Sequence, residues 1–452
     1  MPVIEFVGQS ARDSDNVAAA PSRLINCYRE PTAEGKYVLK PVLGLASYAD
    51  LGGIFVRAMA TVDGKMFVAC GGRLIEVLSD ATTIDRGNIG DGVTTMAGNN
   101  GVVTICVGGL YWNWDGSSRT QPSAGAFSSF GAVEYFGNYT ILTELDGRRF
   151  QWSDIADPTD LPGLNFSTAD GRDDNLLRPL FINGRLYLWK ETSHEIWYLT
   201  GAAGASAFER MAGGVQDIGL KAVGLICRIP GGAFMVGDDG RAHLVSGGIK
   251  PVSTTAVETA LDQGTPVTCF AYEDEGHTFC VVTFSDRPAW VYDLATGEWH
   301  ERAEAGQMPW SVSATVKWDG TWYAGRNDGD LFTFGGSADG ALPVTKEAVS
   351  RTMHVEENIR LKYVEVFPRK GIEDGGITLS LSRDCGLTWG PEKERNVGPL
   401  GSTRHKVRWR NQGIVESDVN ARLGTIEDNM MELNASINSL RTRFSDKGLI
   451  AP

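Results

Sequence analysis

The sequence predicts a mainly β protein with three parts: a β-propeller of six or seven blades, a small C-terminal β-sandwich-like domain and a C-terminal heptad helix. Three patterns support this fold class. Glycine-punctuated hairpins recur at a regular spacing, the net charge changes sign after the last hairpin, and apolar residues near the C-terminus follow a heptad. We therefore divide the chain into an extended N-terminal arm (1–50), a propeller (51–345), a basic β-sandwich-like domain (346–412) and a C-terminal helix (413–452).

The N-terminal arm has mixed polarity and no sustained hydrophobic period. Residues 22–31 and 37–41 resemble short strands, separated by a turn at Gly35. Because these strands stand apart from the repeats that follow, we expect the arm to pack on the propeller or to close its ring.

The propeller is predicted by seven turn glycines that lie 37, 36, 47, 48, 44 and 44 residues apart: Gly64, Gly101, Gly137, Gly184, Gly232, Gly276 and Gly320. In the clearest copy, Asp63-Gly64 forms a turn, residues 66–70 form a buried strand, and residues 74–77 return after a second turn. Repeats of this length that are mostly strand are typical of propeller blades, because one small sheet cannot bury both of its faces alone. The blade number depends on whether the copies at Gly101 and Gly137 each form a full blade. A β-sandwich with long hairpins is the alternative.

Composition limits the classes of function. With 42 basic and 56 acidic residues the net charge is −14, so the molecule as a whole is not built to grip phosphates. The seven cysteines are scattered, mostly in apolar strands, which indicates reduced core residues and folding in a reducing cytoplasm. No basic stretch precedes an apolar run at the N-terminus, and no segment approaches 18 consecutive apolar residues, so we expect neither a secretion signal nor a membrane span.

The charge balance reverses in residues 346–412, where 13 basic and 9 acidic residues give a net charge of +4, against −16 for residues 1–345. Apolar and polar residues alternate there in three segments, as expected for strands of a small antiparallel sandwich: 361–367, 377–382 and 405–410. The basic run 404–410 fits a charged edge strand, or a contact with an acidic patch on a neighbouring subunit, better than a phosphate site.

The C-terminal helix is predicted by eight apolar residues spaced alternately by four and three positions, which form an unbroken heptad seam: Val419, Leu423, Ile426, Met430, Leu433, Ile437, Leu440 and Phe444. Ser417-Asp418 supplies an N-cap, and Gly448 supplies a C-terminal stop. Such a seam needs a partner, either the surface of this protein's own domain or other copies of the chain.

The sharpest local motif is Ser-x-Asp-x-Gly-x-Thr-Trp, in which Ser382, Asp384, Gly386 and Trp389 resemble the Asp-box of sialidases. An Asp-box locks a hairpin, because the carboxylate accepts backbone N–H groups across the turn while the tryptophan packs beneath it. The motif is structural and does not cleave sugars. One good copy is present, outside the propeller repeats.

No catalytic, cofactor-binding or metal-binding set is predicted. The acidic clusters at 154–160, 170–174 and 238–239 match no calcium ladder and are better interpreted as solvated turns. The six histidines never fall in a metal-binding pair. The sequence contains no nucleophile elbow, no phosphate-binding loop and no dinucleotide-binding fingerprint.

Taken together, the chain resembles the tail-hub or nozzle proteins of short-tailed bacteriophages, the packaged-DNA stabilisation protein family. The resemblance covers roughly residues 20–410, and the segments that show it occur in the family's order. These segments are 23–28 with Gly44, the hairpin 70–74, the strand 291–293 followed by Trp299, and the strand and turn 379–389. The resemblance does not extend to the heptad helix.

The resemblance implies a structural virion protein, assembled in the infected bacterial cytoplasm and located in the virion tail. In this family six copies form a ring below the portal and adaptor, continue the DNA channel, retain packaged DNA and carry needle, spike or fibre proteins. Double-stranded DNA passes without sequence-specific binding, and an acidic lumen would let it slide. Two alternatives remain: a propeller glycan-binding or glycosidase-like protein, and a cellular propeller scaffold.

Overall fold

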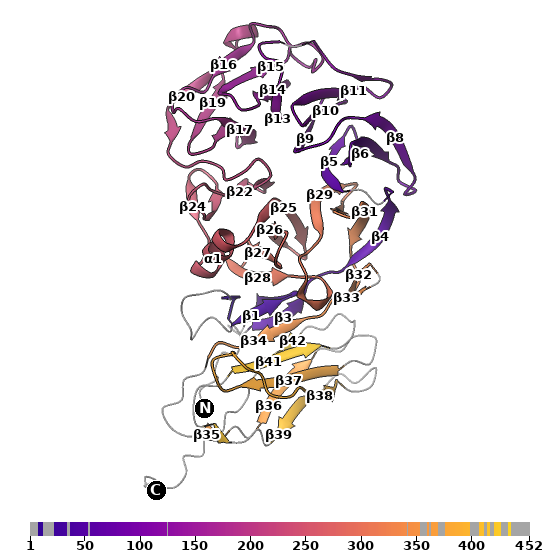
Figure 1. Ribbon diagram of the computed structural model, residues 1–452, viewed down its shortest axis with the longest axis vertical. Helices are drawn as coiled ribbons and strands as arrows, with labels where there is room; N and C mark the ends of the chain where they lie inside the picture. Colours follow the sequence, from indigo (N-terminus) through magenta and orange to yellow (C-terminus); the bar gives the residue numbers. More distant parts are fainter. Residues whose placement is uncertain are drawn as a thin grey trace.

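A computed structural model describes residues 8–11, 22–33, 37–52, 55–123, 125–340, 342–352, 359–360, 363–368, 376–397, 406–410, 414–415, 420–425 and 433–434. Seven groups of four antiparallel strands surround a central axis as the blades of a propeller, and further strands form a sandwich beside the ring (Figure 1). The copies at Gly101 and Gly137 each form a complete blade, which settles the number at seven.

Blades 1 to 4 each consist of four strands consecutive in the sequence. Blade 1 is β5 (Val56–Val62), β6 (Lys65–Cys70), β7 (Arg73–Val77) and β8 (Thr83–Asn88). Blade 2 is β9 (Thr94–Asn99), β10 (Val102–Val107), β11 (Leu110–Trp114) and β12 (Arg119–Thr120). Blade 3 is β13 (Phe130–Phe136), β14 (Tyr139–Glu144), β15 (Arg149–Trp152) and β16 (Phe166–Thr168). Blade 4 is β17 (Leu176–Ile182), β18 (Arg185–Lys190), β19 (His194–Leu199) and β20 (Phe208–Gln216).

Blades 5 and 6 follow the same plan, with the helix α1 (Thr255–Gln263) between them. Blade 5 is β21 (Ile226–Ile229), β22 (Gly232–Val236), β23 (Ala242–Val245) and β24 (Ile249–Pro251). Blade 6 is β25 (Pro266–Asp274), β26 (His277–Phe284), β27 (Ala289–Asp293) and β28 (Glu298–Arg302). Blade 7 is β29 (Val312–Trp318), β30 (Thr321–Arg326), β31 (Asp330–Phe334) and β4 (Leu45–Asp50).

The recurring glycine turns join the first two strands of each blade. In six of the seven turns, two successive residues have positive φ, as in Asp63 (φ 50°) and Gly64 (φ 71°), which is the type I′ geometry that suits a twisted hairpin. Blade 5 differs from the prediction by one residue. Its turn glycine is Gly231 (φ 74°), whereas Gly232 already belongs to β22 and pairs with Ile229.

The ring is closed by β4, which pairs antiparallel with β31 from Leu45↔Phe334 to Asp50↔Asp330. Blade 7 therefore combines one strand from the N-terminal side with three strands from the far end of the repeat. This strand lies within the segment 1–50, for which we expected an arm that packs on the propeller or closes its ring, and β4 closes the ring.

Blade 6 continues without interruption into the sandwich. Its sheet runs β25-β26-β27-β28-β1-β34-β41-β37-β38, so nine strands extend from the propeller axis to the far edge of the molecule (Figure 1). The added strands are β1 (Arg23–Ile25), β34 (Glu347–Val349), β41 (Asn420–Thr425), β37 (Gly376–Ser382) and β38 (Lys393–Asn396).

A second sheet, in the order β2-β3-β42-β36-β39, completes the sandwich. Its strands are β2 (Cys27–Pro31), β3 (Tyr37–Pro41), β42 (Leu433–Asn434), β36 (Tyr363–Pro368) and β39 (Val407–Arg410). Short pairs are also formed by β32 (Ala338–Asp339) with β33 (Leu342–Pro343), and by β35 (Ile359–Arg360) with β40 (Ile414–Val415).

The predicted heptad helix is wrong where the structure describes this region. Residues 420–425 form β41, which lies between β34 and β37 and pairs Leu423 with Ala348 and Leu379. Leu433 belongs to β42 and pairs with Leu39 and Pro368. β34 and β37 need this middle strand to satisfy their backbone groups, and that requirement outweighs the heptad spacing. The other seam residues lie outside the described part of the chain: Val419, Ile426, Met430, Ile437, Leu440 and Phe444.

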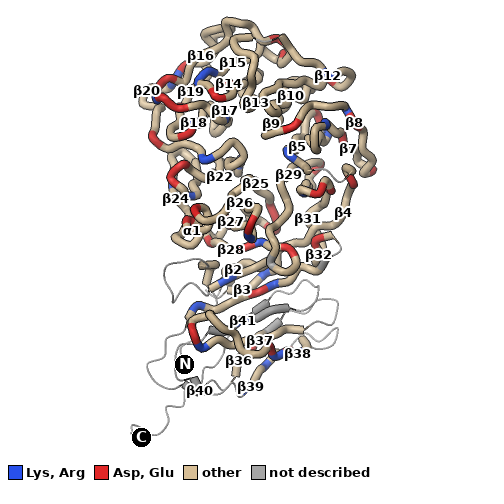
Figure 2. Tube along the Cα trace, in the orientation of Figure 1, with Lys and Arg blue, Asp and Glu red and all other residues tan. Residues whose placement is uncertain are grey.

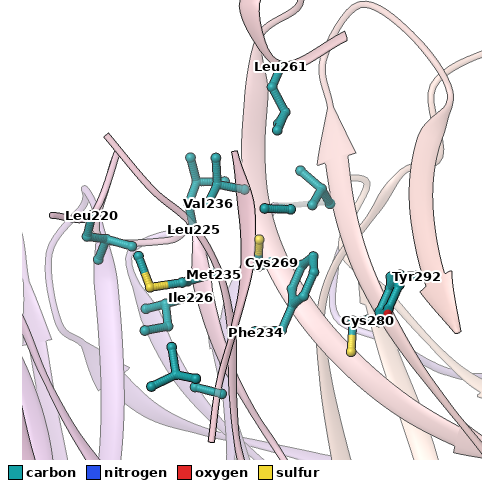
Figure 3. Close-up of a cluster of buried hydrophobic side chains, with 14 of the residues drawn as sticks. Leu220, Leu225, Ile226, Phe234, Met235, Val236, Leu261, Cys269, Cys280 and Tyr292 are labelled. Atoms are coloured by element: carbon teal, nitrogen blue, oxygen red, sulfur yellow. The ribbon is translucent and has the colours of Figure 1, made fainter. Parts of the chain in front are cut away.

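The hydrophobic core lies between neighbouring blades. Its largest cluster joins blades 4, 5 and 6 to α1, and Figure 3 shows Phe234, Met235, Cys269 and Cys280 within it. Phe234 is fully buried, and its ring centroid lies 6.2 Å from that of Trp299 in blade 6. The cysteines in the described residues are all free, and most are buried, so they act as small apolar side chains.

Candidate interaction surfaces

The Asp-box residues come together in the turn that follows β37. One carboxylate oxygen of Asp384 accepts the backbone N–H of Thr388 at 2.8 Å and the Ser382 hydroxyl at 2.7 Å, and the other accepts the Thr388 hydroxyl. The Gly386 N–H donates to Ser382 Oγ at 2.8 Å. The Thr388 hydroxyl, the Thr388 N–H and the Ser382 hydroxyl favour the charged carboxylate and lower the pKa of Asp384 to about 2.

Trp389 lies at the end of this turn, where the Arg422 guanidinium from β41 is 5.3 Å from its ring centroid. Cys385 (φ 55°) and Gly386 (φ 83°) adopt the left-handed conformation that reverses the chain. The turn therefore orders the connection between two sandwich strands and anchors it to β41. The arrangement holds the turn in one conformation.

Replacing Asp384 by alanine is expected to speed amide hydrogen exchange at Thr388 by at least about tenfold, because its main acceptor is lost. Gly386 should be affected less, since its acceptor Ser382 remains. Exchange followed by mass spectrometry checks this, with Glu394→Ala on the exposed strand β38 as the control. Unchanged exchange in the Asp384 variant would show that the carboxylate does not hold the turn.

Two cations of the basic run, Arg408 of β39 and Lys406 just before it, form ion pairs with the neighbouring strand of the sandwich. Arg408 and Lys406 both pair with Glu365 of β36, whose side chain is 4% exposed. Val407 and Trp409 alternate with these cations and are buried. The described part of the basic run, residues 406–410, thus has a core-facing side and a side that carries ion pairs.

Sequence reasoning missed a cluster of ionic contacts that attaches the N-terminal hairpin, β2 and β3, to blade 6. His277 Nδ1 lies 2.8 Å from Asp293 Oδ2, and His277 Nε2 lies 2.6 Å from Glu30 Oε2. With a carboxylate at each ring nitrogen, the imidazolium form satisfies both contacts, and the Asp293 hydrogen bond contributes most to raising the pKa of His277.

Two further ion pairs join β1 and β2 to β28 of blade 6. Arg29 Nη2 lies 2.7 Å from Glu298 Oε1, and Arg23 Nη2 lies 2.8 Å from Glu301 Oε2. The partners in each pair are more than 260 residues apart in the sequence, so no local pattern could have indicated them.

Carboxylates of the acidic clusters form ion pairs and hydrogen bonds within the part of the fold that the structure describes. Asp174, in the cluster 170–174, pairs at 2.8 Å with the fully buried Lys190, and Asp238 accepts the backbone N–H of Gly219. Within the described ranges, no group of three or more His, Cys, Asp or Glu side chains could hold a metal ion. No helix in the part of the chain that the structure describes is long and apolar enough to span a membrane.

Charge is distributed unevenly over the propeller. Asp and Glu are frequent in the loops around the ring, whereas Lys and Arg are fewer there (Figure 2). A surface of this kind repels polyanions and attracts basic partners.

Comparison with known proteins gives a match along most of the chain. A family model described as Bacteriophage P22 Gp10, beta-propeller, matches residues 1–342, and one described as Bacteriophage P22 Gp10, beta-sandwich, matches residues 347–438. No curated protein matches the chain.

Two solved structures are similar at low identity. The computationally designed Ika8 protein is 14% identical, with a TM-score of 0.43, and the match covers 64% of this chain and 99% of that one. BamB from Moraxella catarrhalis is 11% identical, with a TM-score of 0.40, and the match covers 74% of this chain and 98% of that one. At these scores the two structures do not bear on function.

Proposed function

Because this chain belongs to the family of bacteriophage P22 Gp10, and is therefore a structural protein of the phage tail, we propose that it is the hub, or nozzle, of a short tail. Several copies, six in the family that the sequence resembles, form a closed ring below the portal and adaptor. The ring continues the DNA channel, retains the packaged DNA and carries spike, fibre or needle proteins. It acts by assembly and not by catalysis.

The observation that carries this proposal is the order of the two family matches, propeller then sandwich, over most of the chain. The fold is compatible with it. The nine-stranded sheet fixes the sandwich to the propeller, which suits a part that must hold its neighbours in a fixed geometry. The net charge of −14 favours sliding of DNA over binding, because basic contacts to phosphate would have to be broken at ejection.

The experiment is a measurement of mass in solution by light scattering, over a range of protein concentrations, with and without purified portal and adaptor proteins. The proposal predicts a species of about six times the 48.9 kDa of one chain, either alone or once the neck is supplied. A monomer that ignores the neck at every concentration would contradict it. Binding of that monomer to glycans would then favour the glycan-binding alternative.

A further inference from the structure

One face of the propeller contains a cavity of about 690 Å³ at the axis. In each blade the second and third strands turn on this face, and the chain leaves for the next blade from it; we call it the cavity face. The residues that line the cavity come from blades 1, 2, 4, 5, 6 and 7, or from the loops between them. Its volume is typical of a binding pocket.

The cavity mouth exposes apolar side chains. Phe55, Val93 and Val267 line it and are 36%, 62% and 42% exposed. Leu110 and Leu145 extend this apolar surface over blades 2 and 3, with exposures of 41% and 42%. Exposed apolar residues gathered at a cavity indicate an interaction site, whereas single ones scattered over a surface do not.

The polar groups of the cavity make their hydrogen bonds within the fold. Arg57 pairs with Asp91 and donates to the Gly92 carbonyl at 3.2 Å. Lys221 Nζ donates to the Leu261 carbonyl at 3.1 Å. What remains for a ligand is mainly apolar side chains, so the ligand must itself present an apolar group.

The loops around the cavity set the charge of that ligand. Together with helix α1 they contain fourteen acidic residues and five basic ones: Arg148, Arg172, Lys221, Arg241 and Arg287. Four strand cations, Arg57, Lys190, Arg210 and Arg326, also pair with some of these carboxylates. An excess of negative charge remains, which opposes nucleic acid and favours a basic partner.

We infer that the cavity face binds a segment of another protein that presents an apolar tip flanked by lysine or arginine. A second copy of this chain fits less well. Its basic strand β39 offers cations, but the apolar residues between them, Val407 and Trp409, are 2% and 1% exposed and already buried in the sandwich. The inference stands whether or not copies of the chain form a ring.

The test uses the full-length protein and three labelled peptides, followed by fluorescence anisotropy. The first peptide is Lys-Lys-Leu-Val-Phe-Lys-Lys, the second has glutamate in place of lysine, and the third has Ser-Gly-Ser in place of the apolar tip. The first is expected to bind at least about tenfold more tightly than the others, and salt should weaken it.

The variant Val93→Gln/Val267→Gln should reduce binding of the first peptide by at least about tenfold. The control is Ile155→Gln, which alters an apolar residue of similar exposure (50%) beside the acidic residues of the opposite face. Both variants change exposed side chains, so both should remain folded. No detectable binding at about 1 mM, equal binding of all three peptides, or equal loss in the control would overturn the inference. Self-association that only the double variant abolishes would assign the face to a second copy instead.

Discussion

Replacing His277 by leucine is expected to lower the free energy of unfolding by about 3 kcal/mol, because it leaves two carboxylates without their shared cation. Leaving Asp293 without its partner costs more than leaving Glu30 without one, because the Asp293 side chain is 1% exposed whereas that of Glu30 is 29% exposed. Asp293 keeps two donors, the Ala295 N–H and the Thr296 hydroxyl, so the loss lies at the lower end of the range for a broken buried pair.

The effect should depend on pH. The pKa of His277 is raised in the folded protein, so its contribution is fully present below the ordinary histidine value of about 6.5 and is lost as the pH rises through the raised pKa. The pKa of Asp293 is lowered, mainly by the His277 hydrogen bond acting against burial, so its contribution is lost as the pH falls below about 3.8. The difference between the parent and the variant should therefore be largest between about pH 4 and 6.5.

The other charged groups around His277 do not reverse this sign. Burial lowers the pKa of His300 to about 3, so that ring is neutral throughout the window. Burial and then Glu275 raise the pKa of Asp274, and Lys40 lies 3.0 Å from Glu275. The contact between Lys40 and Glu275 remains in the variant and cancels in the comparison. His277 also lowers the pKa of Asp274, so its loss acts on Asp274 in the same direction as on Asp293.

Urea unfolding at several pH values measures the effect, with Glu30→Gln as the matched control. That variant keeps an acceptor for His277 at a partly exposed position and should cost only about 1 kcal/mol. Parallel stability curves for the parent and His277→Leu between about pH 4 and 8 would contradict the assignment of an imidazolium shared by two carboxylates.

Replacing Phe234 by alanine is expected to cost about 3–5 kcal/mol, the usual range when a fully buried aromatic ring is removed. The ring is 0% exposed and lies between blades 5 and 6, where its neighbours belong to different sheets (Figure 3). Because two blades would have to move together to refill the space, we expect a cavity to remain.

Urea unfolding followed by tryptophan fluorescence measures this loss. The control Ile155→Ala removes an exposed side chain and should change stability by less than about 0.5 kcal/mol. A cost below about 1 kcal/mol for the Phe234 variant would mean that the interface between the blades repacks freely.

The propeller could be predicted from the sequence because each blade hairpin is specified by residues that are close together in the chain. A type I′ turn needs residues that tolerate positive φ, and Asp-Gly or Asn-Gly pairs mark four of the seven positions directly. The error at blade 5 arose where Gly231 and Gly232 are adjacent, so composition alone could not identify the turn residue.

The C-terminal part and the ionic contacts could not be predicted in the same way. The position of Leu423 fits a heptad and a strand equally well. The strand forms because β34 and β37, which come from distant parts of the chain, lie on either side of it. Asn420 and Gly424 were the local signals against a helix. Glu30 and His277 are 247 positions apart, so their contact could be identified only in the folded structure.

The continuous sheet of nine strands also determines how the molecule would respond to mechanical force. A pull on the sandwich across the strands would load their hydrogen-bonded ladders in series, so the shortest ladder would break first. That ladder is the parallel contact of β1 with β28, which has one register pair, Ile25↔Glu301. Rupture there would leave the ladders inside the blades intact, and the load would then pass to the contacts of Arg23 with Glu301, Arg29 with Glu298 and Glu30 with His277. The first extension under force is therefore expected at the junction between the sandwich and the propeller.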